Sequence, residues 1–297
     1  MSHQWSPEKT IEPPEALKLI QDQFPKLNAQ HIFLLGAGWD NTAFLIDDAY
    51  IFRFPRRKIA LPFLEAERTL LPLLAERLPL PVPIPKWYGV SQGDYPWPFL
   101  GYKMLDGFTA CRANLTEKQR FDLAVPIAKF LRKLHEMPQE IISKCLIEND
   151  NMSRVNVDVL APKIEKNLFE LKQLGLIDEI KVIKGAFRPP VATTVVHGDF
   201  YVRHLLVDSQ HQLCGVIDWG DIHLGDPAID LSIAHSFLPK EAHDLFKKAY
   251  GGIDEKTWAL AKVRALFSSS LMAVYGYHNQ DPDIVREALR SIAEIAF

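Results

Sequence analysis

Residues 195–231 read VVHGDFYVRHLLVDSQHQLCGVIDWGDIHLGDPAIDL, and the prediction of the fold starts from this stretch. Its apolar runs are short and rich in valine, leucine and isoleucine, and polar turns separate them, which is typical of short strands. They predict strands at 194–196, 205–207 and 214–217.

Acidic and imidazole side chains lie at the ends of these strands and in the loops that join them, and side chains placed in this way can converge on one point. Phosphoryl transfer needs such convergence: one carboxylate orients the attacking hydroxyl, and other groups hold Mg²⁺ against the phosphates. We predict Asp199 for the first role and Asp218 with His204 for the second.

The segments that precede this stretch predict a mixed first part followed by a mainly helical one. An apolar face of Leu17, Ile20 and Phe24 indicates a short helix, and residues from about 60 to 77 indicate another, which Pro72 should end or kink near residue 71. From about residue 115 the pattern is mainly helical, and Pro126 disfavours the first helix there, which has Phe121, Ala124, Ala128, Leu131 and His135 on one face. Strands are predicted at 31–35, 42–46, 50–54 and 98–105. A small β-rich lobe before a helical lobe with an embedded β-rich segment suggests a kinase-type α+β architecture.

The same stretch resembles the aminoglycoside and macrolide phosphotransferases, a family with the protein-kinase-like fold. The match to their catalytic loop is His197-Gly198-Asp199, with His204 five residues beyond the aspartate. Ile217-Asp218-Trp219-Gly220-Asp221 matches their metal motif, and Gly225-Asp226-Pro227 with Asp230-Leu231 matches the segment directly after that motif. The resemblance implies a two-lobed protein with a nucleotide-binding lobe at 1–103 and a catalytic and substrate-binding helical lobe at 104–297.

The first lobe extends the resemblance. Leu35-Gly36-Ala37-Gly38-Trp39-Asp40-Asn41 looks like the family's glycine-rich nucleotide loop, where Gly36 and Gly38 would let backbone approach phosphates. The resemblance further implies that Arg53 contacts the phosphates, that Glu67 pairs with Arg53, and that residues 98–106, Met104 among them, form the hinge against the purine.

Two positions depart from the wider kinase pattern. Arg53 stands in place of lysine, and its planar fork suits both a carboxylate and a phosphate; Lys58 is the less favoured substitute. His204 stands in place of asparagine, although Mg²⁺ prefers oxygen ligands. The macrolide and some aminoglycoside enzymes are similar at this position, so we interpret His204 as a subfamily feature.

The composition limits the classes of function. Lys plus Arg total 34 against 37 for Asp plus Glu, a formal charge of −3, which argues against a general nucleic-acid binder. The three cysteines are widely spaced and fit a reducing compartment, and the start of the chain lacks the apolar run of a signal peptide. We therefore expect a cytoplasmic protein with no membrane or nucleic-acid partner, as a monomer or homodimer.

Simpler interpretations compete with the catalytic one. His197, Asp226 and Asp230 are expected to be structural, and Arg56-Arg57-Lys58 is most simply a solvated turn. A zinc site of His197, Asp199 and His204 is chemically possible but explains neither Asp218 nor the first lobe. A nucleotide-binding pseudoenzyme, with Arg53 and His204 as signs of decay, and a protein kinase are the remaining alternatives.

The expected activity is transfer of the γ-phosphate of ATP or GTP, with Mg²⁺, to a hydroxyl of a small molecule. The resemblance points first to an antibiotic acceptor of the macrolide or 2″-aminoglycoside type, and second to a metabolic alcohol such as choline, homoserine or a sugar. A cationic aminoglycoside would need an acidic acceptor surface, for which Asp221 is a candidate. The fold alone does not fix the acceptor.

Overall fold

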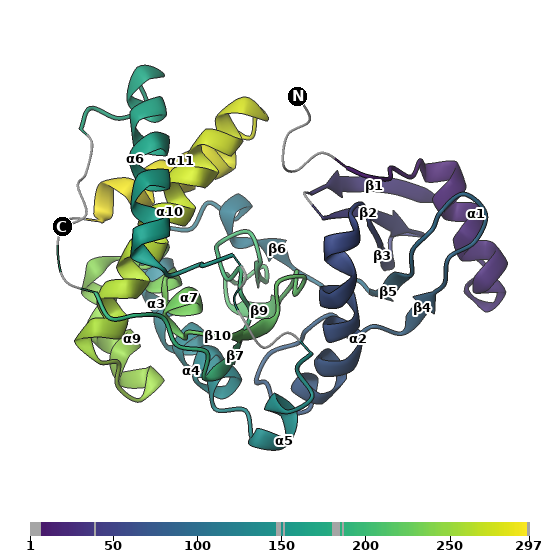
Figure 1. Cartoon of the computed structure of the whole chain (residues 1–297), viewed down its shortest axis with the longest axis horizontal. Coiled ribbons are helices and arrows are strands. Elements are labelled where there is room, and N and C mark those ends of the chain that lie inside the picture. The colour runs from purple at the N-terminus through teal and green to yellow at the C-terminus, as the bar shows by residue number, and fades with distance from the viewer. Residues whose placement is uncertain are drawn as a thin grey trace.

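A five-stranded antiparallel sheet forms the first part of the molecule, in a computed structural model that describes residues 7–38, 40–146, 150, 152–179, 185 and 187–295. The strand order is β1-β2-β3-β5-β4. The strands are β1 (Ile32–Ala37), β2 (Asn41–Ile46), β3 (Tyr50–Pro55), β4 (Trp87–Gly89) and β5 (Phe99–Lys103). Figure 1 shows this sheet at one end of the molecule, with helix α1 (Pro13–Gln23) beside it.

The side chains of β3 divide between the two faces of this sheet. Phe52 and Phe54 are buried in an aromatic cluster with Phe99 that also contacts α1. Because successive residues of a strand point to opposite faces, Arg53 points away from this cluster. It points instead toward helix α2 (Leu61–Ala75), which carries Glu67.

The second part of the molecule is mainly helical and surrounds two small sheets. One sheet has the order β6-β8-β9 and the other pairs β7 with β10; Figure 1 shows β7, β9 and β10 between α2 and the helical end. The strands are β6 (Phe108–Thr109), β7 (Thr194–Val196), β8 (Leu205–Val207), β9 (Leu213–Val216) and β10 (His223–Gly225). The helices are α3 (Glu117–Asp122), α4 (Ala124–His135), α5 (Gln139–Ile142), α6 (Val157–Gln173), α7 (Ala228–Leu231), α8 (Ile233–Ser236), α9 (His243–Tyr250), α10 (Glu255–His278) and α11 (Pro282–Glu294).

Two prolines act differently from each other. The expectation that the helix would end at about residue 71 is wrong, because α2 continues through Pro72 to Ala75. Leu70, Leu71 and Leu74 are fully buried on either side of the proline, and their packing offsets the lost backbone hydrogen bond. Pro126, by contrast, lies in the first turn of α4, where a missing N–H costs little, and the chain has already broken between α3 and α4.

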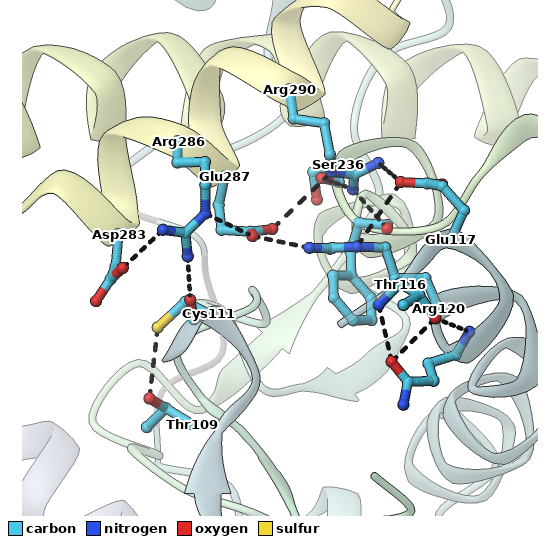
Figure 2. Close-up of polar contacts among 12 residues, drawn as sticks. Thr109, Cys111, Thr116, Glu117, Arg120, Ser236, Asp283, Arg286, Glu287 and Arg290 are labelled. Carbon is cyan, nitrogen blue, oxygen red and sulfur yellow. Dashed lines mark hydrogen bonds and ion pairs between the residues drawn. The ribbon is translucent and has the colours of Figure 1, made fainter. Parts of the chain in front are cut away.

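A buried ion pair joins α3 to the C-terminal helix α11. Arg120 Nη2 donates to Glu287 Oε1 at 2.8 Å, and the two residues are only 3% and 5% exposed. Figure 2 shows the two side chains pointing toward each other, with Arg286 and Arg290 of α11 beside them. Nε and Nη1 of Arg120 and Oε2 of Glu287 are buried without a hydrogen bond, so the 2.8 Å contact is the main direct bond of a pair that Glu117, Arg286 and Arg290 support only at 3.7–4.0 Å.

We expect Arg120→Met to lower the free energy of unfolding by about 3–5 kcal/mol, because it leaves the Glu287 carboxylate buried with weaker partners. The double variant Arg120→Met/Glu287→Leu should recover much of this loss, since neither member of the buried pair is then left without the other. Urea denaturation measures both. Lys118→Met on the same helix removes an exposed pair with Asp122 and is expected to cost less than about 1 kcal/mol; equal losses in Arg120→Met and Lys118→Met would contradict the prediction.

None of the helices in the described ranges is both long enough and apolar enough to span a membrane.

Candidate active site

The loop between β7 and β8 carries His197, Asp199 and His204, and buried polar contacts fix its start. The backbone N–H groups of His197 and Gly198 donate to the two carboxylate oxygens of Asp230 at 2.7 and 3.0 Å. Asp230 is fully buried and also contacts His135 Nε2 of α4 at 3.1 Å. Burial would raise the pKa of Asp230, but the contact with His135 outweighs burial and lowers it. Asp230 therefore stays charged and anchors the loop.

Both ring nitrogens of His197 are occupied. Nε2 lies 3.0 Å from the carbonyl oxygen of Ile217, and Nδ1 accepts from the backbone N–H of Asp199 at 3.3 Å. Burial lowers the pKa of His197, which favours the neutral ring that these two contacts need. His197 thus joins the loop to the residue before Asp218. Because both ring nitrogens are already hydrogen-bonded, His197 has no free nitrogen to ligate a metal, which argues against the zinc site of His197, Asp199 and His204.

His204 connects the two acidic residues of the site. Its Nδ1 contacts the backbone carbonyl of Asp199 at 2.8 Å, and its Nε2 lies 3.3 Å from Asp218 Oδ2. Burial would lower the pKa of His204, but the Asp218 carboxylate raises it to about 9. Asp199 itself has a side chain that is 41% exposed, and burial of the rest raises its pKa. The hydroxyl-orienting carboxylate predicted from sequence is thus accessible and lies beside the predicted metal pair.

Asp218 also reaches the first part of the molecule. Its Oδ1 pairs with Arg53 Nη2 at 2.9 Å, and Arg53 Nη1 pairs with Glu67 Oε2 at 2.8 Å. Burial would lower the pKa of Arg53, but Glu67 and Asp218 outweigh burial and raise it, so the guanidinium stays charged. The structure therefore brings together the predicted Arg53–Glu67 pair and adds a contact to Asp218 that the sequence did not predict.

Local backbone geometry makes this approach possible. Asp218 has a φ of 60°, in the left-handed region that is uncommon for a residue with a side chain and is often found at functional sites. Two residues later, a Cβ on Gly220 would lie 2.6 Å from Arg53 Nη2. A Cβ on Gly198, whose φ is 88°, would lie 2.2 Å from the carbonyl oxygen of Asp221. Glycine at these two positions lets the metal-motif loop contact both Arg53 and the catalytic loop.

The predicted nucleotide loop joins β1 to β2. A Cβ added to Gly36 would meet nothing within 4 Å, which leaves open space there. The turn closes with the N–H of Gly38 donating to the carbonyl of Asn41 at 2.9 Å, while Trp39 lies outside the described residues. The prediction of a solvated turn at residues 56–58 missed a bracing role: Arg56 donates to the carbonyl of Gly38, and Arg57 pairs with Asp40.

Met104 directly follows β5 and is 37% exposed. Its backbone N–H donates to the carbonyl of Ala49 at 2.8 Å, so this donor is already used within the sheet. Its carbonyl and its side chain are the groups left to meet a purine, and its assignment to a hinge stays a prediction.

The residues predicted to hold Mg²⁺ form a sparse but suitable donor set. The described residues contain no cluster of three or more His, Cys, Asp or Glu side chains that could hold a metal ion. Mg²⁺ commonly uses only one or two protein ligands, with substrate phosphates and water completing its shell. Asp218 Oδ2 and His204 Nε2 lie together, and 47% of the Asp218 side chain is exposed. The Asp218 carboxylate is accessible, whereas the His204 ring is buried, and its Nε2 can ligate an ion only after it gives up the proton that the Asp218 carboxylate stabilises. This donor set fits an ion that takes most of its ligands from a nucleotide and water.

We expect Glu67→Ala to lower the free energy of unfolding by about 3 kcal/mol, because the buried Arg53 then loses its buried partner and keeps the half-exposed Asp218. The measurement is urea denaturation without nucleotide. Glu65→Ala on the same helix is the control: Glu65 pairs with the half-exposed Arg68, and its loss should cost less than about 1 kcal/mol. A Glu67 variant as stable as the Glu65 variant would count against a tight Arg53–Glu67 pair.

The sheet-plus-helix architecture and the convergence of an arginine, a glutamate, two aspartates and a histidine define a kinase-like α+β fold. A model of the phosphotransferase enzyme family matches residues 31–266. The chain therefore belongs to the phosphotransferase enzyme family, whose members transfer phosphate to hydroxyl groups. The predicted fold class and family are both confirmed.

Individual relatives are distant. The chain is 21% identical over 263 residues to the uncharacterized protein YcbJ of Bacillus subtilis (strain 168), covering 82% of this chain and 83% of that one. A structure of APH(2")-IIia with GDP and kanamycin matches with a TM-score of 0.66 at 22% identity, covering 93% and 96% of the two chains. A structure of macrolide 2'-phosphotransferase type I matches with a TM-score of 0.59 at 20% identity, covering 98% and 99%. Likeness at this level establishes a shared fold.

Proposed function

We propose that this protein is a small-molecule kinase that transfers the γ-phosphate of ATP or GTP to an acceptor hydroxyl. The observation that supports this most is one continuous set of contacts from residues far apart in sequence. Glu67 meets Arg53, Arg53 meets Asp218, Asp218 lies beside His204, and His204 contacts the backbone of Asp199. A cation for phosphates, a metal pair and an accessible carboxylate are the parts that phosphoryl transfer requires.

In this proposal the nucleotide binds between the lobe of residues 1–103 and the lobe of residues 104–297. Gly36 and Gly38 cover its phosphates, and Met104 lies near its base. Arg53, steadied by Glu67, contacts the phosphates. Asp218 and His204 hold Mg²⁺, which when bound neutralises charge on the phosphates.

Asp199 accepts a hydrogen bond from the acceptor hydroxyl and orients its oxygen for in-line attack on the γ-phosphorus. The new bond joins the acceptor oxygen to that phosphorus, the bond from the γ-phosphorus to the bridging oxygen breaks, and the nucleoside diphosphate leaves. The hydroxyl proton passes to Asp199 and then to solvent. Positioning and charge neutralisation matter more here than strong deprotonation.

The chemical class of the acceptor distinguishes the two candidate functions, an antibiotic phosphotransferase and a metabolic small-molecule kinase. The solved relatives include complexes with kanamycin, gentamicin and streptomycin. In this chain, Asp221, the predicted acidic contact for a cationic aminoglycoside, is paired with Arg154, which is itself 4% exposed. This pairing favours the metabolic alternative over the aminoglycoside one. None of the three described cysteines forms a disulfide, which agrees with the proposed cytoplasmic location.

The test is phosphoryl transfer from GTP and from ATP, with Mg²⁺, to a panel of macrolides, aminoglycosides and metabolic alcohols. Wild type and Asp199→Asn are run side by side. Transfer to one class of acceptor that disappears in the variant supports both the activity and the role of Asp199. Saturable nucleotide binding without transfer to any acceptor would favour the pseudoenzyme alternative.

A further inference from the structure

Arg264 of α10 is a buried arginine without a counter-ion. It is 8% exposed, and its guanidinium carbon lies 5.5 Å from the centre of the Phe267 ring. Among the described residues it has no hydrogen bond and no carboxylate oxygen within 4.0 Å. Its nitrogens make no hydrogen bond within the described ranges, yet they are not sealed from solvent, so the tip of the side chain reaches accessible space.

The other buried arginines show how unusual this is. Arg53 pairs with Glu67 at 2.8 Å, Arg120 with Glu287 at 2.8 Å, and Arg154 with Asp150 at 2.6 Å. A guanidinium carries five N–H donors and cannot lose its charge in a protein, so burying one without a partner is unfavourable. A bound ligand with a negative charge would supply the partner that Arg264 lacks within the described residues.

Arg264 lies on the Asp199 side of the site. Helix α10 packs against α7, whose Asp230 binds the backbone directly before Asp199. Burial lowers the pKa of Arg264, and the charge of Asp199 opposes this effect. Arg264 and Asp199 thus lie close enough for their charges to interact, and an acceptor whose hydroxyl meets Asp199 would come within reach of Arg264.

The neighbouring carboxylates have their own partners. Arg154 donates to Asp150 and also to Asp221, whose backbone is in contact with Gly198. In the described part of the chain, Arg264 is consequently the one charged side chain near Asp199 that lacks a partner. An ammonium group on the acceptor would be repelled by Arg264, whereas a carboxylate or phosphate would compensate it.

We propose that the acceptor is a hydroxyl compound that also carries a carboxylate or phosphate group, which Arg264 binds while Asp199 orients the hydroxyl. This inference rests on the proposed kinase function and narrows its substrate class to anionic alcohols. The phosphoryl-transfer step itself is as described above. A bidentate contact from the guanidinium fork would fix the acceptor relative to Asp199 and contribute to specificity.

The experiment compares acceptors that share a carbon skeleton and differ in charge. One set is glycerate and glycerol 3-phosphate with neutral glycerol, and the other is gluconate and glucose 6-phosphate with neutral glucose. Kanamycin is the cationic probe. Release of nucleoside diphosphate above the hydrolysis background is measured with saturating Mg²⁺ and nucleotide. We expect kcat/KM for at least one anionic member to exceed that of its neutral partner more than about tenfold. Preference for carboxylate or for phosphate identifies which anion is bound.

Arg264→Met should lower kcat/KM for the anionic acceptor about 10–100-fold more than it lowers kcat/KM for the neutral partner, since the loss of positive charge near Asp199 affects both acceptors and the loss of the anion contact affects one. Arg264→Lys keeps the charge but not the planar fork, so its kcat/KM for the anionic acceptor should lie between those of wild type and Arg264→Met. Melting temperature and nucleotide Kd establish that each variant is folded. Equal losses for anionic and neutral acceptors would mean that Arg264 only positions Asp199, and would overturn the inference.

The inference and the proposed function fail in different ways. If a neutral acceptor or kanamycin stimulates diphosphate release and the anionic probes do not, the anionic acceptor is wrong and the kinase function stands. If nucleotide binds but no probe of any charge stimulates release, both the anionic acceptor and the kinase function are contradicted in favour of the pseudoenzyme alternative. If nucleotide does not bind at all, the proposed function fails first.

Discussion

Asp199→Asn is expected to lower kcat by about 10²–10⁴-fold while leaving the nucleotide Kd nearly unchanged. The amide has the size of the carboxylate, so the loop should keep its hydrogen bonds to Asp230, which involve the backbone of His197 and Gly198. The His204 contact also uses the backbone carbonyl of Asp199 and should survive. The variant loses the negative charge that accepts the proton of the substrate hydroxyl. In the proposed mechanism this carboxylate acts on the substrate and not on the nucleotide, so nucleotide affinity should be kept.

The measurement is single-turnover phosphoryl transfer combined with nucleotide titration of the same variant. Asp244→Asn, on the exposed start of α9, serves as a control for loss of an acidic side chain and should behave as wild type. Near-normal turnover in Asp199→Asn would remove Asp199 from its proposed role. A large loss of nucleotide affinity would show instead that Asp199 acts on the metal or the phosphates.

Asp218→Asn is expected to give a loss of about 10²–10³-fold in kcat/KM, comparable to removing one preorganised group that stabilises transition-state charge. Its signature should differ from that of Asp199→Asn. Because Asp218 is proposed as a metal ligand, the Mg²⁺ concentration that gives half the maximal rate should rise at least about tenfold. Arg53 keeps its bond to Glu67 at 2.8 Å, so the variant should remain folded.

A titration of rate against Mg²⁺ at saturating nucleotide separates the two variants. A raised Mg²⁺ requirement in Asp218→Asn, with an unchanged one in Asp199→Asn, supports the division of roles between them. The same Mg²⁺ requirement in wild type and Asp218→Asn would refute the metal assignment, and Asp218 would then serve mainly to anchor Arg53.

Much of the site is encoded in local sequence. The spacing of His197, Asp199 and His204 between two short apolar runs was enough to predict the loop, its flanking strands and the residues to test. The strands at 194–196 and 205–207 form as predicted. Local pattern works here because strand period and turn residues depend on neighbours within a few positions. It failed at Pro72, where buried leucines from the same helix outweigh the proline.

By itself, the sequence determined the kinase-like class, the order of the elements and the list of candidate side chains. Only the tertiary structure decided which charges meet: that Asp218 binds Arg53, that Arg154 pairs with Asp221, and that buried Arg264 has no carboxylate oxygen within 4.0 Å among the described residues. Arg154 and Asp221 are separated by 67 positions, and Arg120 and Glu287 by 167. Nothing in local periodicity connects such residues, because their distance is set by how helices pack and by where water is excluded. The proposed anionic acceptor rests on that balance of buried charge, which is why the fold could be predicted from the sequence and this class of acceptor could not.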